Sequence, residues 1–521
     1  MEGRPNLTLT LGMRYEYDTP KFDPQERNYV IIPGQQSTRY PSAPLGLNFP
    51  CDPHAPCPGT YFPDKNNFAP RFGFAYDPFG KGRTSIRGGF GVFYDVLNGQ
   101  DVQWQNGTVP FFSSAVLTYT KANVAANGPS TIMSDPYGAG GVPNPFPSKP
   151  LSPNLNYKTA GFLPFGPNSV LIDPNQRNPY TYGWNLTFQQ ALSAGMGMQV
   201  AYVGSSSHKQ IVNVEGDPFF LGTTQRPLNL QPGLQYPNAY AYFSVDKSLG
   251  NSNYNGLLVS VTKRISSSVI GQTFFTAAYT FSKVLSDQDA YLQNVSAYNS
   301  HQFYAPATYD VSHRFVLSGG WELPFDRMWA KGPKRLTGGW SLYPIFSTQT
   351  GFPVDFNSGI ARSASVPGPA GDGVPALVRP YWTGGSEQSV DPRQVQSFVV
   401  GGVTRTGHFF FNPSSFLIPA CYSSTAPPGT SGGCPASTYG NLQRNTFRGP
   451  GLTNFDLSLE KKTFLTSERV QLLFRAEFFN VLNHTEFLSP FGQVSVRSAL
   501  IGQTTSTRDP RIGQLALKLI F

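Results

Sequence analysis

Four cysteines are the most reactive side chains of this chain, and they fall into two pairs that are local in the sequence, Cys51 with Cys57 and Cys421 with Cys434. Pairing within each local pair is favoured among the three possible connectivities, and it suits an oxidising compartment. The alternatives are free thiols, or zinc held by all four cysteines. No Cys-x-x-Cys spacing supports zinc. Two such disulfides would restrict the long connections in which they lie.

Other polar residues show no catalytic grouping. Six histidines are scattered without metal-ligand spacing, so hydrogen-bonded or solvated roles are expected: His54, His208, His301, His313, His408 and His484. Asp287 and Asp289 could bind a cation, although two carboxylates in a polar loop are more often solvated. The stretch Arg87-Gly-Gly-Phe-Gly lacks the strand-to-helix unit of a phosphate loop, so its glycines are expected to relieve crowding. We expect no enzyme, no cofactor and no metal site.

Apolar and polar residues alternate with a period of two in many segments, which predicts β-strands. At the C-terminus, Leu515, Leu517, Leu519 and Phe521 share one face, because successive strand residues point to opposite faces. A terminal Phe on an apolar stripe needs something apolar to lie against. One interpretation is an edge strand on a soluble core, and the other is the last strand of an outer-membrane β-barrel. The same alternation recurs about a dozen times, in paired units.

Composition favours the barrel. Charged residues make up 13% of the chain, against about 25% in a typical soluble domain. No run approaches the roughly 20 apolar residues that a transmembrane helix needs, so this chain could cross a bilayer only as a closed barrel. Aromatic residues reach 14%, as aromatic girdles would require. The 53 glycines and 47 prolines indicate many turns and long loops.

Charges within the predicted strands fall on the face opposite the aromatic residues. A charge at the middle of a lipid face would cost about 2–4 kcal/mol, whereas a polar lumen accommodates it. For any single strand, the solvated face of an ordinary antiparallel sheet explains the pattern as well. The candidate lumen-facing charges are Arg14, Glu16, Arg71, Arg87, Arg314, Glu322, Asp456, Glu460, Arg475 and Glu477.

Connections between the strands alternate between short and long. Loops beyond about 15 residues are uncommon in compact soluble domains, yet six of them would lie on the same side of every hairpin: 18–67, 96–180, 206–253, 286–311, 351–451 and 483–510. Outer-membrane barrels have this asymmetry, with short periplasmic turns and long extracellular loops. We therefore predict an all-β, transmembrane antiparallel barrel with about twelve strands in this chain.

Several segments resemble the barrel region of Oar-like TonB-dependent receptors, and together they span nearly the whole chain. They are Asn67-Phe-Ala-Pro-Arg-Phe-Gly-Phe-Ala-Tyr-Asp-Pro-Phe-Gly80, Arg87-Gly-Gly-Phe-Gly-Val-Phe-Tyr-Asp95, Asn178-Pro-Tyr-Thr-Tyr-Gly-Trp-Asn-Leu186, His313-Arg-Phe-Val-Leu-Ser318, Phe447-Arg-Gly-Pro-Gly451 and Phe474-Arg-Ala-Glu-Phe-Phe-Asn-Val-Leu-Asn-His484. The resemblance implies an outer-membrane receptor whose barrel encloses a plug, with uptake energised through TonB. Such barrels typically have 22 strands.

The start of the chain departs from that family pattern. Met1-Glu-Gly-Arg-Pro leads directly into a strand, without an export signal. We therefore expect residues 1–521 to be the C-terminal portion of a receptor barrel, with plug and N-terminal domains absent. Whether its first strand can pair to close a smaller barrel is left open.

Two functions follow from the resemblance. The first is active uptake of a nutrient too large for porins, of the oligosaccharide or peptide class. The alternative is a barrel-anchored surface adhesion or interaction protein, or a non-functional receptor fragment. Expected partners are outer-membrane lipid and lipopolysaccharide, the barrel-insertion machinery through the C-terminal signal at Phe521, the TonB complex through a missing N-terminal region, and an unknown extracellular ligand. The net charge of +9 is dispersed, which argues against nucleic acid.

Overall fold

A computed structural model describes most of the chain. The described residues are 2–4, 6–24, 27–106, 119, 121–139, 156–159, 163–166, 169–218, 220, 225–268, 270–289, 300–357, 380–383, 390–400, 403–417, 441–466, 470–488, 493–495 and 501–521. The predicted pair Cys421 and Cys434 lies outside them.

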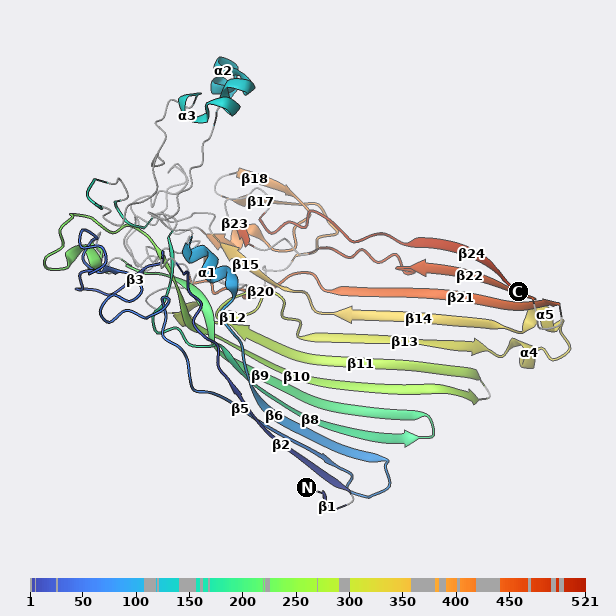
Figure 1. The fold of residues 1–521 in the computed structure, drawn as a ribbon. Coiled ribbons are helices and arrows are strands. Elements are labelled where there is room, and N and C mark those ends of the chain that lie inside the picture. Colours follow the sequence, from blue (N-terminus) through green and yellow to red (C-terminus); the bar gives the residue numbers. More distant parts are fainter. Residues whose placement is uncertain are drawn as a thin grey trace.

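One large antiparallel sheet dominates the described residues, and its strands follow one another in chain order (Figure 1). Twelve long strands form it, and three short strands join it: β1 (Glu2–Arg4) beside β2, β7 (Val170–Ile172) in parallel beside β10, and β12 (Ala305–Pro306) beside β11. This confirms the predicted all-β antiparallel architecture. The long strands are β2 (Leu7–Glu16), β5 (Asn67–Tyr76), β6 (Thr84–Tyr94), β8 (Tyr180–Ser193), β9 (Met196–Glu215), β10 (Ser244–Ser268), β11 (Gly271–Ser286), β13 (His313–Leu323), β14 (Trp340–Gln349), β21 (Leu452–Thr466), β22 (Val470–Phe479) and β24 (Ile512–Ile520).

The strand register keeps apolar residues on one face across the sheet. Leu11 lies opposite Phe72, and Phe72 in turn lies opposite Phe90. The facing of β14 is ambiguous in the sequence, and the register decides it. Phe346 lies opposite Leu317 and Leu342 opposite Trp321, which places both on the apolar face. Tyr343 and Ile345 therefore share the face of the charged residues.

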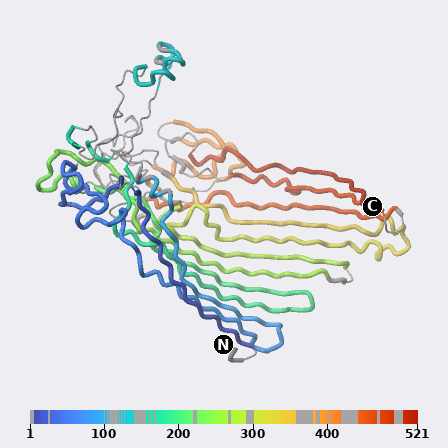
Figure 2. The backbone as a smooth tube through the Cα atoms, viewed as in Figure 1, coloured from blue at the N-terminus to red at the C-terminus, as the bar shows by residue number. Residues whose placement is uncertain are grey.

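Short turns gather at one end of the sheet and the long connections at the other (Figure 1). The two termini lie at the turn end (Figure 2). The first turn is fixed by Asp77, whose carboxylate accepts hydrogen bonds from the backbone N–H of Phe79, Gly80 and Gly82. The turn between β13 and β14 carries α4 (Phe325–Met328) and α5 (Lys334–Thr337).

The long connections contain short elements of their own. The strands are β3 (Val30–Ile31), β4 (Leu47–Asn48), β7 (Val170–Ile172), β12 (Ala305–Pro306), β15 (Pro353–Asn357), β16 (Tyr381–Trp382), β17 (Gln396–Val400), β18 (Val403–Gly407), β19 (Phe416–Leu417), β20 (Phe447–Arg448) and β23 (Gln493–Ser495). The helices are α1 (Gly99–Asn106), α2 (Lys121–Ser134), α3 (Pro136–Ala139) and the 3₁₀ turns η1 (Pro227–Leu230), η2 (Ser300–Phe303) and η3 (Pro413–Ser415).

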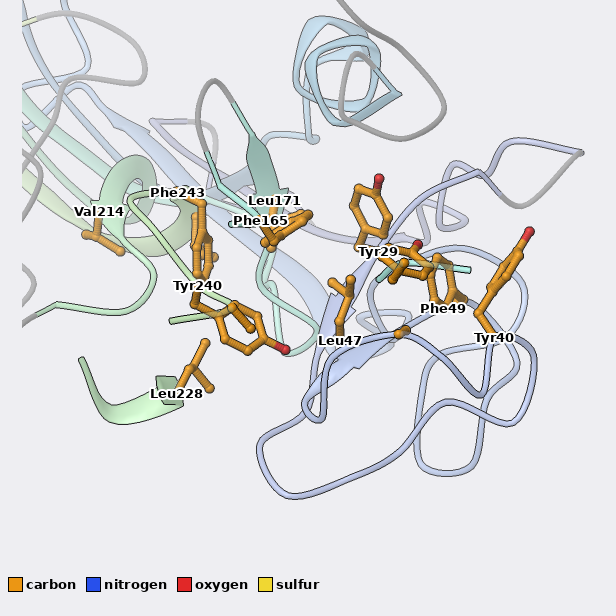
Figure 3. Packing of buried hydrophobic residues seen from close by; sticks show 14 of the residues in the cluster. Tyr29, Tyr40, Leu47, Phe49, Phe165, Leu171, Val214, Leu228, Tyr240 and Phe243 are labelled. Atoms are coloured by element: carbon orange, nitrogen blue, oxygen red, sulfur yellow. The ribbon is translucent and has the colours of Figure 1, made fainter. Parts of the chain in front are cut away.

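Three buried cores lie among these connections in the described residues, the smallest made of Tyr61, Leu97, Ile172 and Ile211. The large loop cluster draws on three of the connections and is shown in Figure 3; its residues are Tyr29, Tyr40, Ala43, Leu47, Phe49, Tyr157, Phe165, Leu171, Val212, Val214, Leu228, Ala239, Tyr240, Phe243 and Val245. The small loop cluster consists of Val354, Phe356, Phe411, Phe416, Leu442, Phe447 and Ile501. The long connections are therefore packed structures with apolar interiors rather than plain surface loops.

The sheet is open within the described residues. β2 and β24 are the long strands at its two ends, and they do not pair with each other. The outer edge of β2 carries only the short strand β1. All nine residues of β24 are exposed, which fits an edge strand. Among the described residues, no helix is long and apolar enough to span a membrane.

Candidate functional site

All ten predicted charges lie on the polar face of the sheet, opposite the apolar stripe. Arg14 and Glu16, on the first long strand, form an ion pair at 2.8 Å. On the next strand, the guanidinium of Arg71 lies 4.8 Å from the ring centroid of Phe93. Since a cation over an aromatic face is stabilised by the ring quadrupole, the ring of Phe93 keeps the guanidinium of Arg71 close to the polar face of the sheet.

A connected ion network spans the last three long strands. Glu460 on β21 is only 3% exposed, and its carboxylate lies 3.0 Å from Nη2 of Arg475 and 3.0 Å from Nζ of Lys462. Arg475 also lies 3.5 Å from Glu477, whose carboxylate accepts a hydrogen bond from Gln514 on β24. A buried carboxylate with two cations is stabilised as the anion. The network therefore fixes the polar face of β21, β22 and β24.

Hollows accompany this network on the polar face. One, of about 430 Å³, is lined by Tyr343, Ile345 and the charged side chains of the network. A second, of about 720 Å³, shares Tyr343 and Ile345 and extends to Arg264 on β10. A third, of about 380 Å³, lies on the same face beside Arg87, among β6, β8, β9 and β10. The charged face is thus grooved, and it can accommodate polar groups or a segment of protein.

The predicted charges do not form one site. Asp456, Glu460, Arg475 and Glu477 line the same hollow. Glu322 lies in the same cross-strand row as Glu460, with Ser341 between them. By contrast, Arg14, Glu16, Arg71 and Arg87 lie on β2, β5 and β6, and Arg314 stands at the loop end of β13.

Lys462 and Gln514 belong to the network but were not among the sequence candidates. The period of two, continued beyond Glu460, would have found Lys462. Its neighbour Lys461 falls on the apolar face near the turns, where its ammonium lies 5.5 Å from the ring centroid of Trp340 and donates to the carbonyl oxygen of Gly338. Lysines near a membrane boundary commonly extend toward polar groups in this way.

Aromatic side chains mark both ends of the apolar face. Toward the loops, Tyr180 packs on His208 with ring centroids 5.4 Å apart, and Phe281 packs on His313 at 5.0 Å. Toward the turns lies Trp321. Along β13, the eight steps from His313 to Trp321 give about 27 Å at about 3.4 Å per residue, which matches an apolar band of about 25 Å.

The motif Phe447-Arg-Gly-Pro-Gly451 anchors the loop end of the sheet. Nη1 of Arg448 donates to the carbonyl oxygens of Asp310 and Gly351, at 2.9 and 3.0 Å. Arg448 also pairs with the buried carboxylate of Asp310. A Cβ added at Gly351 would lie 1.8 Å from the carbonyl oxygen of Gly449. This motif thus has a structural role where the chain leaves β14 and enters β21.

Cys51 and Cys57 are joined by a disulfide, with an S–S distance of 1.97 Å. Between them, the carboxylate of Asp52 accepts hydrogen bonds from Ser37 Oγ at 2.7 Å and from the backbone N–H of Phe49 at 2.9 Å. Burial acts to raise the pKa of Asp52, but these and neighbouring hydrogen bonds outweigh it and hold the pKa below its usual value. The carboxylate therefore orders the loop that the disulfide closes.

Asp287 and Asp289 differ from the expectation of solvated carboxylates. The side chain of Asp287 is 0% exposed, and it accepts from the backbone N–H of Asn251 at 2.8 Å. Asp289 accepts from the backbone N–H of Thr308 at 2.8 Å and pairs with Arg444 at 3.0 Å. Hydrogen-bond donors of the protein itself therefore satisfy both carboxylates. Within the described part of the chain, no group of three or more His, Cys, Asp and Glu side chains could hold a metal ion.

A family model described as "Outer membrane beta barrel domain" matches residues 3–514. No curated protein matches the chain. Among solved structures, the chain is similar to the outer membrane transporter YddB from Escherichia coli, at 10% identity over 88% of this chain and 41% of that one, with a TM-score of 0.45. It is also similar to the siderophore receptor PiuA from Acinetobacter baumannii, at 9% identity over 100% of this chain and 41% of that one, with a TM-score of 0.39.

The ferric-catecholate import receptor Fiu from Escherichia coli K12 is a third similar structure, at 9% identity over 99% of this chain and 42% of that one, with a TM-score of 0.37. The chain therefore spans about two fifths of the length of these proteins. They are transporters and receptors rather than enzymes.

Proposed function

The chain belongs to the family of outer membrane beta barrel domains, and we propose that it forms the wall of a TonB-dependent receptor that imports a nutrient too large for porins. An oligosaccharide or a peptide is the substrate class. The protein is a β-barrel protein of the bacterial outer membrane, so it is surrounded by outer-membrane lipid.

The observation that carries the proposal is the contrast between the two faces of the sheet. One face is apolar between aromatic residues at its two ends. The other carries the network around Glu460 and the adjoining hollows of about 430 and 720 Å³. A polar wall lined with fixed charges suits a lumen through which a hydrated nutrient moves or in which a plug domain sits.

Three partners belong to the proposal. TonB would supply the energy through a region outside this chain. Phe521 would be read by the barrel-insertion machinery, and it is suited to that role because it is 94% exposed and ends an apolar stripe. The anionic headgroups of lipopolysaccharide would attract the net positive charge of +9.

Growth of the native bacterium tests the importer. A strain lacking the gene should grow normally on maltose and free amino acids, but slowly on maltoheptaose or on a casein peptide digest as sole carbon source. The native gene should restore growth. In the complemented strain, deletion of tonB should abolish it again. Normal growth of the deletion strain on every large nutrient would contradict the proposal.

A surface interaction protein is the second candidate, and the packed loop clusters favour it. The large loop cluster buries Tyr29, Phe165 and Phe243 from different connections, which gives these loops a fixed outer shape. Rigid loops can present a binding surface without transport. In that case, the deletion strain would grow normally on large nutrients and would lose binding of whole cells to a host or mineral surface.

A further inference from the structure

Asp246 lies where two of the long connections, 96–180 and 206–253, meet at the loop end. On β10 it pairs with Asn213 of β9 and with Ile172 of β7. β7 in turn contacts α1. Asp246 stands five residues before Asn251, the hydrogen-bond partner of His208 in the loop-end aromatic residues. At about 3.4 Å per residue this places it about 17 Å beyond them, outside the membrane band.

The carboxylate of Asp246 is buried without a cation. Its side chain is 0% exposed, and Oδ1 accepts a hydrogen bond from Nδ2 of Asn213 at 2.9 Å. No described residue hydrogen-bonds to Oδ2, and none forms an ion pair with this carboxylate. Buried Glu215, on the neighbouring strand, instead has Arg226 at 2.5 Å. An ionised carboxylate without such a partner is costly inside a protein.

The groups around Asp246 do not offset that cost. From α1, Asp101 is itself 0% exposed and acts on Asp246 as a like charge. β9 contributes the neutral amide of Asn213, and the segment after β7 contributes only the backbone N–H of Asp173, which donates to the backbone oxygen of Asp246 at 3.0 Å. Lys247 is the next residue on the same strand. Because adjacent strand side chains point to opposite faces, its ammonium is directed away from the carboxylate of Asp246.

We propose that a proton on Asp246 holds this junction of α1, β7, β9 and β10 closed, and that deprotonation near neutral pH opens it. Opening would separate α1 and β7 from β10, beside Leu171 and Val245 of the large loop cluster. The outer loops would then be tightly packed in mildly acidic surroundings and looser in alkaline ones. This inference stands apart from the proposed import.

The direction of the pH effect follows from the thermodynamic linkage between protonation of Asp246 and opening of the junction. Burial, with a further contribution from Asp101 and against the Asn213 hydrogen bond, raises the pKa of Asp246 from 3.8 to about 7. A raised folded-state pKa gives stability that is complete below pH 3.8 and is lost as the pH rises through about 7. Between pH 6 and 8.5, these two values correspond to an increase of about tenfold in the opening equilibrium.

Hydrogen exchange of the full chain in outer-membrane vesicles tests this. After correction for intrinsic exchange, protection of peptides covering 97–106 and 169–176 should fall about tenfold from pH 6 to 8.5. Asp246→Asn should remove that fall. Asp95→Asn, at an exposed carboxylate at the start of the connection that carries α1 and β7, should retain it. Peptides covering 353–357, in the small loop cluster, should not change. This internal comparison serves even if Asp246→Asn fails to fold.

Three outcomes would overturn the proposal. Protection of the native protein could be the same at both pH values, or the fall could persist in Asp246→Asn. Millimolar CaCl₂ at pH 8.5 could also restore protection in the native protein and not in Asp246→Asn. That last result would assign neutralisation of the site to a bound cation instead of a proton.

Discussion

Arg475 on β22 lies directly opposite Glu460 on β21, with its guanidinium 3.0 Å from the buried carboxylate. Arg475→Met would leave Lys462 as the remaining cation on Glu460. We expect a loss of about 1–3 kcal/mol in the free energy of unfolding, below the cost of breaking a fully buried pair because the Arg475 side chain is partly exposed. Urea unfolding in lipid vesicles measures this. Arg314→Met, at an exposed arginine, is the control, and an equal loss in both variants would contradict the role of the network.

The two faces of the sheet should respond oppositely to a new charge. Leu317 lies on the apolar face of β13, opposite Ala277 and Phe346, whereas adjacent Ser318 borders the hollow of about 720 Å³. Leu317→Lys should cost about 2–4 kcal/mol and reduce the heat-modifiable protein in outer membranes, because its ammonium would face lipid. Ser318→Lys should cost little. Equal membrane yields for the two variants would show that the faces are wrongly assigned.

The strands and their faces could be predicted from the sequence because a period of two survives in each strand without knowledge of its neighbours. β14 shows the limit of this signal. Tyr343 and Ile345 are large and apolar on the polar face, so the local pattern could not be oriented, and only the cross-strand register to Leu317 and Trp321 decided it. Lys462 was missed for a related reason, since the predicted strand was followed only as far as Glu460.

The loop clusters could not be predicted in this way. Tyr29, Phe165 and Tyr240 pack together from three connections, yet each stands in a segment without regular periodicity. Sequence patterns report local repeats, and contacts between distant irregular segments leave no such repeat. The partners of Asp287 were hidden likewise, because the backbone N–H of Asn251 reaches it from another connection.

Gly351 should not tolerate a side chain. An added Cβ would lie 1.8 Å from the carbonyl oxygen of Gly449, which is backbone and cannot move aside cheaply. We expect Gly351→Ala to cost about 1–3 kcal/mol and to expose the small loop cluster to trypsin. Gly99→Ala is the matched control, since nothing lies within 4 Å of a Cβ there. Unchanged proteolysis of Gly351→Ala would refute the close packing at this motif.

Two carboxylates of the large loop region should give it an optimum between acid and neutral pH. Hydrogen bonds hold the pKa of Asp52 below 3.8 despite burial, so its contribution is present above that value and is lost as the pH falls through the lowered pKa. Burial raises the pKa of Asp217 from 3.8 to about 6, so its contribution is lost as the pH rises through about 6. Resistance of the loops to a protease active from pH 3 to 8 should therefore peak near pH 4 and fall from there to pH 6. Asp217→Asn should make the decline between pH 4 and 6 shallower, and a decline identical to that of the native protein would argue against Asp217.

Reduction of the disulfide should loosen the first long connection and leave the sheet intact. Cys51 and Cys57 close a short loop, for which the chain-entropy relation gives about 2 kcal/mol. That loop also carries Asp52 and follows Phe49 of the large loop cluster, so Cys51→Ser/Cys57→Ser should increase hydrogen exchange in peptides covering 35–57. Peptides from β13 and β21 should exchange as before, because their hydrogen bonds belong to the sheet. Addition of dithiothreitol to the native protein should reproduce the effect of the variant. An effect that extended to β13 and β21 would mean that the loop and the sheet unfold together, contrary to their separate cores.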